Sequence, residues 1–407
     1  MKKLKSLIFF IFISGLIFGQ SIEISYLNQN ESSNFRDIYF VDGLVGYASS
    51  YSGKIIKTSD GGETWTTIYS NSDINVLGLY FINEDYGFAV GGNSGSIGSI
   101  VLKTSNGGGT WQADTLDKKV LNTVCFINAD TGFVGGLGNL YKTENGGDSW
   151  SPISLDGSYN IKELKFVNDS VGYLSALYGK MLKSTDCGES WSLLNTGISS
   201  HIYAFDFWDA DIGYAGGQGG FIKTIDGGEN WELLNNAPSE IYSVTCLDKN
   251  FVIAGGQGSY SGGDFGFHFG AVNYSTDGGN NWTFNNYLTE VTSIIYLSFP
   301  TSKIGFGVGM GSKVLKLGIN GNIEISDEIN RNDSHIVYPN PANGKIYFQF
   351  QDDLRGFNFL LYDIKGKLVA NKLISSKEFD ISNLNHGIYL YKIITNENTY
   401  NGKIVKR

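Results

Sequence analysis

Apolar and polar residues alternate in short stretches along most of the chain, and glycine-rich turns separate these stretches. Alternation with a period of two is typical of β-strands, and no segment keeps the spacing of an amphipathic helix. One strand motif recurs in seven copies: IYFVD (38–42), LYFIN (79–83), VCFIN (124–128), LKFVN (164–168), FDFWD (205–209), VTCLD (244–248) and LSFPT (297–301). A glycine-bearing stretch follows each copy. The pattern predicts an all-β fold built from seven similar units.

A second motif, [ST]-x-[DN]-x-G-x-[STN]-W, follows in six of the seven units. Its copies are KTSDGGETW (57–65), KTSNGGGTW (103–111), KTENGGDSW (142–150), KSTDCGESW (183–191), KTIDGGENW (223–231) and YSTDGGNNW (274–282). Successive tryptophans are 46, 39, 41, 40 and 51 residues apart. A period of about 40–45 residues with several short strands is typical of a β-propeller. The seventh unit has lost the tryptophan, so residues 21–327 are predicted to form a seven-bladed β-propeller.

The N-terminal stretch IEISYLN (22–28) precedes the first strand motif much as the segments after each tryptophan precede later copies. It is therefore predicted to be the fourth strand of the seventh blade. Closure of this kind joins the two ends of the propeller and leaves no open sheet edge at the join.

The tryptophan motif predicts a structural turn. An Asp or Asn side chain accepts backbone N–H groups of such a turn, and a Trp packs a large apolar face between sheets. Asn stands in for Asp in two copies, an exchange that a catalytic acid would not tolerate. These structural residues are Asp60, Trp65, Asn106, Trp111, Asn145, Trp150, Asp186, Trp191, Asp226, Trp231, Asp277 and Trp282.

The motif resembles the Asp-box, or BNR, repeat of sialidases and related propellers. Over roughly residues 35–320 the KTxDGGxxW spacing is most similar to the photosystem II assembly-factor propellers. That resemblance implies the fold. Members of that group bind a protein partner through a basic surface, but this chain has a net charge of −10 and only Arg36 among arginines of the propeller. The same count argues against a sialidase, which needs three arginines, and the acidity argues against nucleic acid.

The composition changes after the last blade. Residues 328–336 are polar and are predicted to be a linker, and 337–407 have the alternation of a small antiparallel β-sandwich domain. This segment resembles the type A sorting domain of the type IX secretion system (T9SS) of Bacteroidetes. The matching residues are Tyr338, Pro339, Asn340, Pro341, Gly366, Gly387, Tyr389 and Lys406. The resemblance implies the type IX secretion machinery as a partner and a secreted or outer cell-surface location. A carbohydrate-binding sandwich is the alternative.

Residues 1–20 combine early lysines with an apolar run at positions 7–18 and small or polar residues after it, as in a signal peptide. The run is short for a membrane span, so no transmembrane span is expected once it is removed, and a retained anchor is the alternative. Cys125, Cys187 and Cys246 show no pairing pattern. The sequence therefore leaves two alternatives for these cysteines: three structural thiols, or one disulfide and one thiol.

A ligand site is predicted in the glycine-rich loop 256–270, whose aromatic side chains could stack on sugars or anchor a protein. Its residues are Tyr260, Phe265, Phe267, His268 and Phe269. An extended hairpin that folds back on its blade is the alternative. Glycine pairs such as Gly135-Gly136 and Gly216-Gly217, at the ends of second strands, are predicted to line an axial channel. Asp264 and His268 alone are too few for a metal, and no cofactor is expected.

These features predict an exported propeller that binds a polysaccharide or a protein partner without catalysis. The alternative is a glycoside hydrolase that uses a pair of carboxylates around the channel. The sequence does not identify such a pair.

Overall fold

The computed structural model describes residues 21–27, 33–93, 97–260, 267–286, 288–320, 337–338, 342, 344–348, 357–363, 367–374, 378–394 and 399–406. The expected signal peptide and linker lie outside these residues. Contacts divide the chain into two compact units, Met1–Ile325 and Ser326–Arg407. The described residues contain strands and no helix, so the predicted all-β class is confirmed.

The first unit is a seven-bladed β-propeller, as predicted, because its sheets follow one another in sequence and close into a ring. The first strands of the blades are β2 (Phe35–Phe40), β6 (Asn75–Phe81), β10 (Leu121–Phe126), β14 (Ile161–Phe166), β18 (Ile202–Phe207), β22 (Ile241–Cys246) and β25 (Ser293–Ser298). Each first strand contacts the first strand of the next blade, and β25 contacts β2. The first strands therefore surround the axis.

The other strands lie progressively farther from the axis, in antiparallel order. The second strands are β3 (Gly46–Ser50), β7 (Gly87–Asn93), β11 (Gly132–Gly136), β15 (Gly172–Ala176), β19 (Gly213–Gly217), β23 (Val252–Tyr260) and β26 (Ile304–Met310). The third strands are β4 (Lys54–Thr58), β8 (Gly98–Thr104), β12 (Leu140–Thr143), β16 (Lys180–Ser184), β20 (Phe221–Thr224), β24 (Phe267–Ser275) and β27 (Val314–Asn320). The fourth strands are β5 (Thr66–Ser70), β9 (Gln112–Asp114), β13 (Ser151–Pro152), β17 (Ser192–Leu193) and β21 (Glu232–Leu233) in the first five blades.

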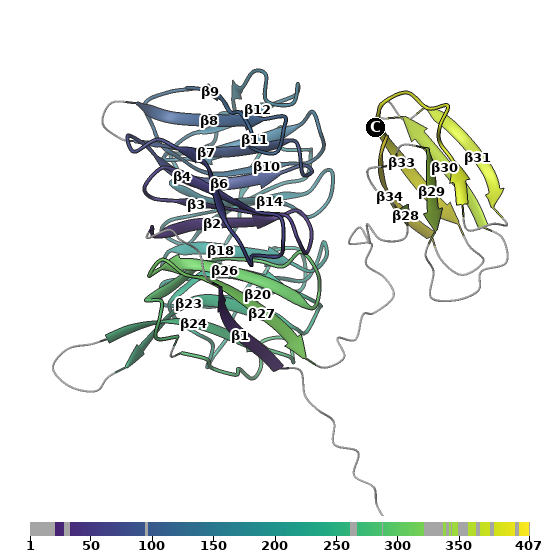
Figure 1. Ribbon diagram of the computed structural model, residues 1–407. Coiled ribbons are helices and arrows are strands. Elements are labelled where there is room, and N and C mark those ends of the chain that lie inside the picture. Colours follow the sequence, from purple (N-terminus) through teal and green to yellow (C-terminus); the bar gives the residue numbers. More distant parts are fainter. Residues whose placement is uncertain are drawn as a thin grey trace, which may run out of the picture. The chain divides into compact units, whose positions relative to one another are not determined.

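The last two blades depart from this scheme. In blade six the fourth strand is reduced to isolated bridges from Tyr274 to Thr283 and from Gly270 to Leu288. In blade seven the fourth strand is β1 (Ser21–Leu27), which pairs antiparallel with β27 from Ser21↔Asn320 to Leu27↔Val314. Figure 1 shows the purple β1 beside the green β27. The predicted closure between the chain ends is confirmed.

The apolar cores of the propeller lie between neighbouring blades. One cluster joins Phe306 and Val308 of blade seven with Phe35, Ile38 and Phe40 of blade one. Aromatic rings stack across these junctions, with centroids 3.6 Å apart for Phe40–Phe306 and for Tyr47–Phe81. In the first five blades, the recurrent phenylalanine of the strand motif thus joins each blade to its predecessor.

The second unit contains two antiparallel sheets. One has the order β28 (Val337–Tyr338), β29 (Lys345–Phe348), β32 (Glu378–Asp380), and the other β31 (Leu368–Ile374), β30 (Phe357–Asp363), β33 (Gly387–Ile394), β34 (Thr399–Lys406). Side chains of both sheets, among them Ile346, Phe348, Phe359 and Ile393, form one buried cluster. The predicted small β-sandwich is confirmed.

Candidate functional site

The Asp-box side chains bond within their own turns. Asp60 Oδ1 accepts hydrogen bonds from the Thr58 hydroxyl at 2.7 Å and the Thr64 N–H at 2.9 Å. Equivalent bonds reach the side-chain oxygen in the other five boxes, at Asn106, Asn145, Asp186, Asp226 and Asp277. Bonds from Thr64 lower the pKa of Asp60 to about 2. A carboxylate with so low a pKa has no proton to donate near neutral pH. In boxes two and three the side-chain amides of Asn106 and Asn145 accept the equivalent hydrogen bonds, so the turn does not need an acid.

The box tryptophans pack edge-on against phenylalanines of the blade junctions. Trp150 meets Phe126 with ring centroids 6.1 Å apart at 79°, and Trp65 meets Phe40 at 6.1 Å and 86°. The edge-to-face arrangement directs the positive edge of one ring at the negative face of the other. The box therefore links the turn after the third strand to the core between blades.

A β-bulge interrupts the first strand of every blade near its start. In each pairing with the second strand one residue is left out of register, and these seven residues are Arg36, Leu77, Asn122, Lys162, Tyr203, Tyr242 and Ile295. A bulge redirects the extra side chain out of the regular pleat. Because the first strands surround the axis, the seven residues form a ring at one end of the channel. We call this the rim ring, and the face that carries it the rim face.

The rim face also carries the turns between second and third strands, because a first strand that begins there is followed by an antiparallel second strand that returns to it. The Asp-boxes and the turns between first and second strands lie on the opposite face. An axial cavity of about 140 Å³ is lined by four residues of the rim ring, Arg36, Leu77, Asn122 and Lys162.

Side chains of the first strands connect every blade to the next. Five accept a backbone N–H from the following first strand: Asp37 from Leu79 at 2.7 Å, Glu163 from Phe205 at 2.8 Å, Asp206 from Cys246 at 2.8 Å, Ser243 from Leu297 at 3.0 Å and Ser298 from Phe40 at 3.2 Å. Two donate to a carbonyl, Tyr80 to Phe126 at 2.9 Å and Asn122 to Ile161 at 2.7 Å. The polar lining of the channel therefore joins the ring together.

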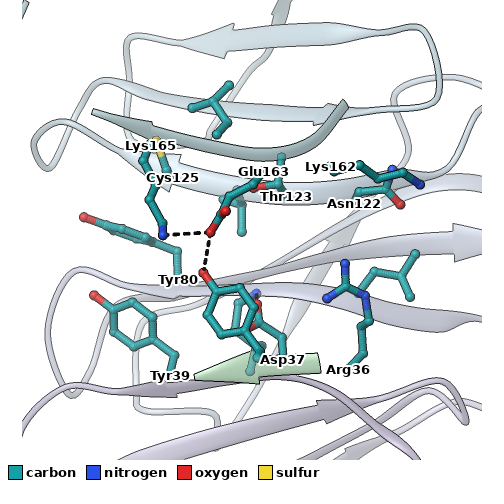
Figure 2. A pocket seen from close by; sticks show the side chains of 15 residues that line it. Arg36, Asp37, Tyr39, Tyr80, Asn122, Thr123, Cys125, Lys162, Glu163 and Lys165 are labelled. Atoms are coloured by element: carbon teal, nitrogen blue, oxygen red, sulfur yellow. Dashed lines mark hydrogen bonds and ion pairs between the residues drawn. The ribbon is translucent and has the colours of Figure 1, made fainter. Parts of the chain in front are cut away.

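A partly buried ionic cluster lies deeper in the cavity. Lys165 Nζ is 2.8 Å from Glu163 Oε1 and 3.7 Å from Asp206 Oδ1, and the Tyr296 hydroxyl donates to Glu163 Oε1 at 3.3 Å. Figure 2 shows Lys165 and Glu163 pointing toward each other. Burial opposes the charge on Lys165, but the Glu163 and Asp206 carboxylates outweigh it and raise its pKa. Lys165 therefore forms an internal ion pair with Glu163 and lies close to Asp206 as well.

Asp37 is the remaining carboxyl of the cavity. Its exposed fraction is 6%, and burial raises its pKa to about 6. Oδ1 accepts the N–H of Ile38 at 2.7 Å, and Oδ2 accepts that of Leu79 at 2.7 Å. Both oxygens are thus engaged with backbone.

Four aromatic rings extend outward from the rim ring. Tyr242 stacks on Tyr203 at 5.5 Å, Tyr203 lies 5.7 Å from His201, and His201 meets Tyr178 edge-on at 4.9 Å. We call these four residues the aromatic row. Tyr178 is 68% exposed and has φ of 63°, a left-handed conformation that is unfavourable for a bulky side chain. Its N–H donates to His201 Nδ1 at 3.1 Å, which holds the turn in this conformation.

The aromatic loop that the sequence singles out is only partly described. Phe265 and Asp264 lie outside the described residues, as do the side chains of Tyr260 and Phe267. The backbones of Tyr260 and Phe267 pair in a long hairpin of β23 and β24, in which His268 is exposed and Phe269 half-buried. The ligand site proposed for this loop therefore stays a prediction. No group of three or more metal-ligating side chains occurs in the described parts of the chain.

The glycine pairs do not line the channel, and that prediction was wrong. They belong to second strands, one layer away from the axis. A Cβ on Gly135 would lie 3.2 Å from the Ile161 side chain, and one on Gly136 would lie 2.1 Å from the Val120 carbonyl oxygen. Their small size serves close packing with the next blade and the preceding loop. The channel residues belong instead to the strand motif and the bulge before it.

The three cysteines are free, and Cys125 and Cys246 are buried whereas Cys187 is exposed. Cys187 has φ of 59° and occupies a position at which the other boxes have glycine.

In the second unit, two of the residues that suggest a sorting domain come together. Gly387 at the start of β33 pairs with Lys406 in β34, and Ala342 forms a bridge to Lys406. Tyr389 is in the core, and its hydroxyl donates to the Asn385 carbonyl at 3.0 Å. Tyr338 contributes backbone to β28, and Pro339, Asn340, Pro341 and Gly366 lie outside the described residues.

Comparison with known proteins supports this division of the chain. Residues 336–407 match the family model of the secretion system C-terminal sorting domain. The second unit is a type IX secretion sorting domain. Residues 64–159 match the model of the photosynthesis system II assembly factor YCF48. The sorting domain marks the chain for export through the type IX system, and the described residues contain no helix that could span a membrane.

Solved structures show the same propeller fold. A structure titled "YCF48 bound to D1 peptide" is 20% identical, with 72% of this chain and 96% of that chain covered and a TM-score of 0.59. YCF48 from Cyanidioschyzon merolae is 20% identical, covers 72% and 98%, and has a TM-score of 0.58. The WD40 repeats of RRP9 are 12% identical, with 73% and 97% covered and a TM-score of 0.59. No curated protein matches the chain. The predicted similarity to the photosystem II assembly-factor propellers is confirmed.

Proposed function

We propose that this chain is a non-catalytic binding propeller that acts outside the cell, where its rim face recognises a polysaccharide or a protein partner. The observation that carries the proposal is a contrast on one face. The channel carboxylates are engaged in bonds within the ring, whereas the aromatic row beside them runs from the half-buried Tyr242, Tyr203 and His201 to the exposed Tyr178. Exposed aromatic rings are common anchors for sugars and for partner proteins. A relative whose title names a bound peptide supports a binding role for this fold.

The sorting domain supports a route of export for the propeller. Residues 1–20 act as a signal peptide, and the machinery of a member of the Bacteroidetes then recognises residues 337–407 in the periplasm. The propeller of residues 21–327 reaches the outer cell surface or the medium, connected by the linker 328–336.

One observation favours glycoside hydrolysis as a second candidate. Burial raises the pKa of Asp37 to about 6 within the axial cavity, and a raised carboxyl pKa is what a general acid needs. However, Asp37 would have to give up a backbone N–H on each oxygen to contact a substrate. Glu163, a second carboxyl in the cavity, is neutralised by Lys165.

The binding role is tested with the full chain and a panel of polysaccharides and cell-surface proteins. Retention and newly released reducing ends are measured together. We expect retention without release, and we expect Tyr178→Ala to weaken it. Tyr86→Ala is the matched control, because Tyr86 is an exposed tyrosine on the opposite face. Release of reducing ends that Asp37→Asn abolishes would establish the hydrolase instead.

The export route is tested by deleting residues 338–407. We expect the truncated propeller to remain in the periplasm in a folded, protease-resistant form. Its appearance at the cell surface in normal amounts would exclude the proposed role of the tail.

A further inference from the structure

Two cations of the rim ring have no close ion-pair partner among the described residues. Within the described residues, neither Arg36 nor Lys162 forms an ion pair or a side-chain hydrogen bond. Lys165, the other lysine that lines the cavity, has two carboxylates nearby, those of Glu163 and Asp206. The rim therefore has local positive charge on a chain whose net charge is −10.

Arg36 and Lys162 line the same cavity. Arg36 comes from blade one and Lys162 from blade four, and both line the axial cavity, as does Asn122 of blade three (Figure 2). Burial and the neighbouring charge of Arg36 lower the pKa of Lys162. Both side chains are half-buried. Two like charges held in one partly desolvated mouth repel each other, and an anion between them would relieve that repulsion.

The carboxylate oxygens of the deeper cavity are already engaged with other groups. Asp37, next to Arg36 in the chain, directs both oxygens to backbone N–H groups, and Glu163, next to Lys162, directs its oxygens to Lys165 and to Phe205. The rim cations are thus left to an external group.

We propose that Arg36 and Lys162 bind the carboxylate of an acidic sugar, so that the ligand of the propeller is a polysaccharide with uronate units. This inference rests on the proposed binding function and names its ligand class. A uronate has its carboxylate directly on the sugar ring. It can therefore place the anion between the two cations while the rest of its ring lies at Tyr203 and Tyr242 of the same rim ring. Neighbouring sugars then follow the aromatic row toward Tyr178.

The structure favours a sugar over an acidic peptide. An extended peptide usually gains affinity by pairing with a free strand edge. Here the inner edges of the first strands are partly occupied, because Leu79, Phe205, Cys246, Leu297 and Phe40 donate their N–H groups to side chains of the preceding blade. A sugar needs no strand edge.

The charge also limits the density of anionic units. Two cations on an acidic chain suit occasional uronates among neutral sugars, whereas a polyanion with a charge on every unit would be repelled by the rest of the protein. The probe is therefore a deacylated gellan oligosaccharide, in which several neutral sugars separate successive glucuronates. Its carboxyl-reduced form is the matched ligand, because only the charge is removed.

The test measures Kd by calorimetry for the full chain and both oligosaccharides. We expect the reduced form to bind about 10-fold more weakly, as for the loss of a charged hydrogen bond. Arg36→Gln and Lys162→Gln should each weaken binding of the acidic form about 10-fold and leave the reduced form unchanged. Lys303→Gln, an exposed lysine in the turn between β25 and β26 on the opposite face, should change neither.

Thermal unfolding shows that the variants are folded, which we expect because neither cation has a partner in the described structure. Equal affinity for both oligosaccharides would overturn this inference; if Tyr178→Ala still weakened both, the binding function would stand. Binding of a glutamate-containing peptide in place of the saccharide, with dependence on Arg36, would show that the ligand class is wrong. Absence of binding to either oligosaccharide would also contradict the uronate assignment, and the broader panel would then decide the binding function separately.

Discussion

The six box tryptophans occupy equivalent positions, yet their indole N–H groups differ. Trp65 donates to the Gly62 carbonyl at 2.9 Å, whereas Trp150 Nε1 is buried and has no partner among the described residues. Phenylalanine keeps most of the ring and removes the N–H. We expect Trp65→Phe to cost about 1 kcal/mol more than Trp150→Phe, because only the first variant loses a hydrogen bond. Urea unfolding of the two variants measures this difference, and equal losses would contradict it.

Asp37 makes the stability of the ring depend on pH. Burial raises its folded-state pKa to about 6, with Glu163 adding to the shift and Arg36 opposing it, against an unfolded value near 3.8. The folded state therefore holds the proton more tightly, and stability falls as pH rises from about 4 through 6. The shift amounts to up to about 3 kcal/mol.

The corresponding variant is Asp37→Asn, which cannot ionise. Relative to the wild type, it should gain stability as pH rises from 4 to 7, measured by urea unfolding at several pH values. Two pH profiles that run parallel would show that Asp37 does not titrate in this range.

At the scale of the strand, one pair of residues is exchanged in blade six. In the other blades a glycine opens the second strand opposite the recurrent phenylalanine; a Cβ on Gly87, for example, would lie 2.2 Å from the Phe81 ring. In blade six the pair is Val252 opposite Cys246. The large and small residues have changed places, and Phe221 of blade five packs against Trp282 there.

This exchange predicts a coupled pair of substitutions. Cys246→Phe alone should cost about 1–3 kcal/mol, because Val252 occupies the space of the ring. Val252→Gly alone should also destabilise, because it leaves a cavity and adds chain entropy. Together the changes restore the arrangement of the other blades, so the double variant should be more stable than the sum of the single losses predicts. Additive losses in thermal unfolding would contradict the exchange.

The repeats made the elements predictable, but they did not reveal the rim. Core positions such as Phe40 and Phe81 recur because each fills the same space between blades. The bulged residues have no such constraint, and Arg36, Asn122 and Tyr203 share a position without sharing chemistry. Alternation also does not say which strand of a blade is innermost, so the sequence alone does not show that the second-strand glycines lie one layer away from the channel. Only the assembled ring brings Arg36 and Lys162 together at the same axial cavity.

For the whole molecule, the junction of blades one and seven differs from the other six in chain separation. The inter-blade bond from Phe40 N–H to Ser298 spans 258 residues, whereas that from Leu79 N–H to Asp37 spans 42. Closing so long a segment costs chain entropy before its contacts form. The pairing of β1 with β27 supplies a strand and the buried Leu27 at this junction.

Loss of β1 should therefore weaken the ring more than its length suggests. We compare a chain that begins at residue 21 with one that begins at residue 28. The shorter chain leaves the edge of β27 unpaired and removes Leu27, which alone is worth roughly 2–5 kcal/mol. We expect a melting temperature lower by about 10 °C and self-association through the exposed strand edge, seen by scanning calorimetry and light scattering. A monomer with unchanged melting would mean that β27 needs no partner, and that the ring is held by the contacts of the first strands alone.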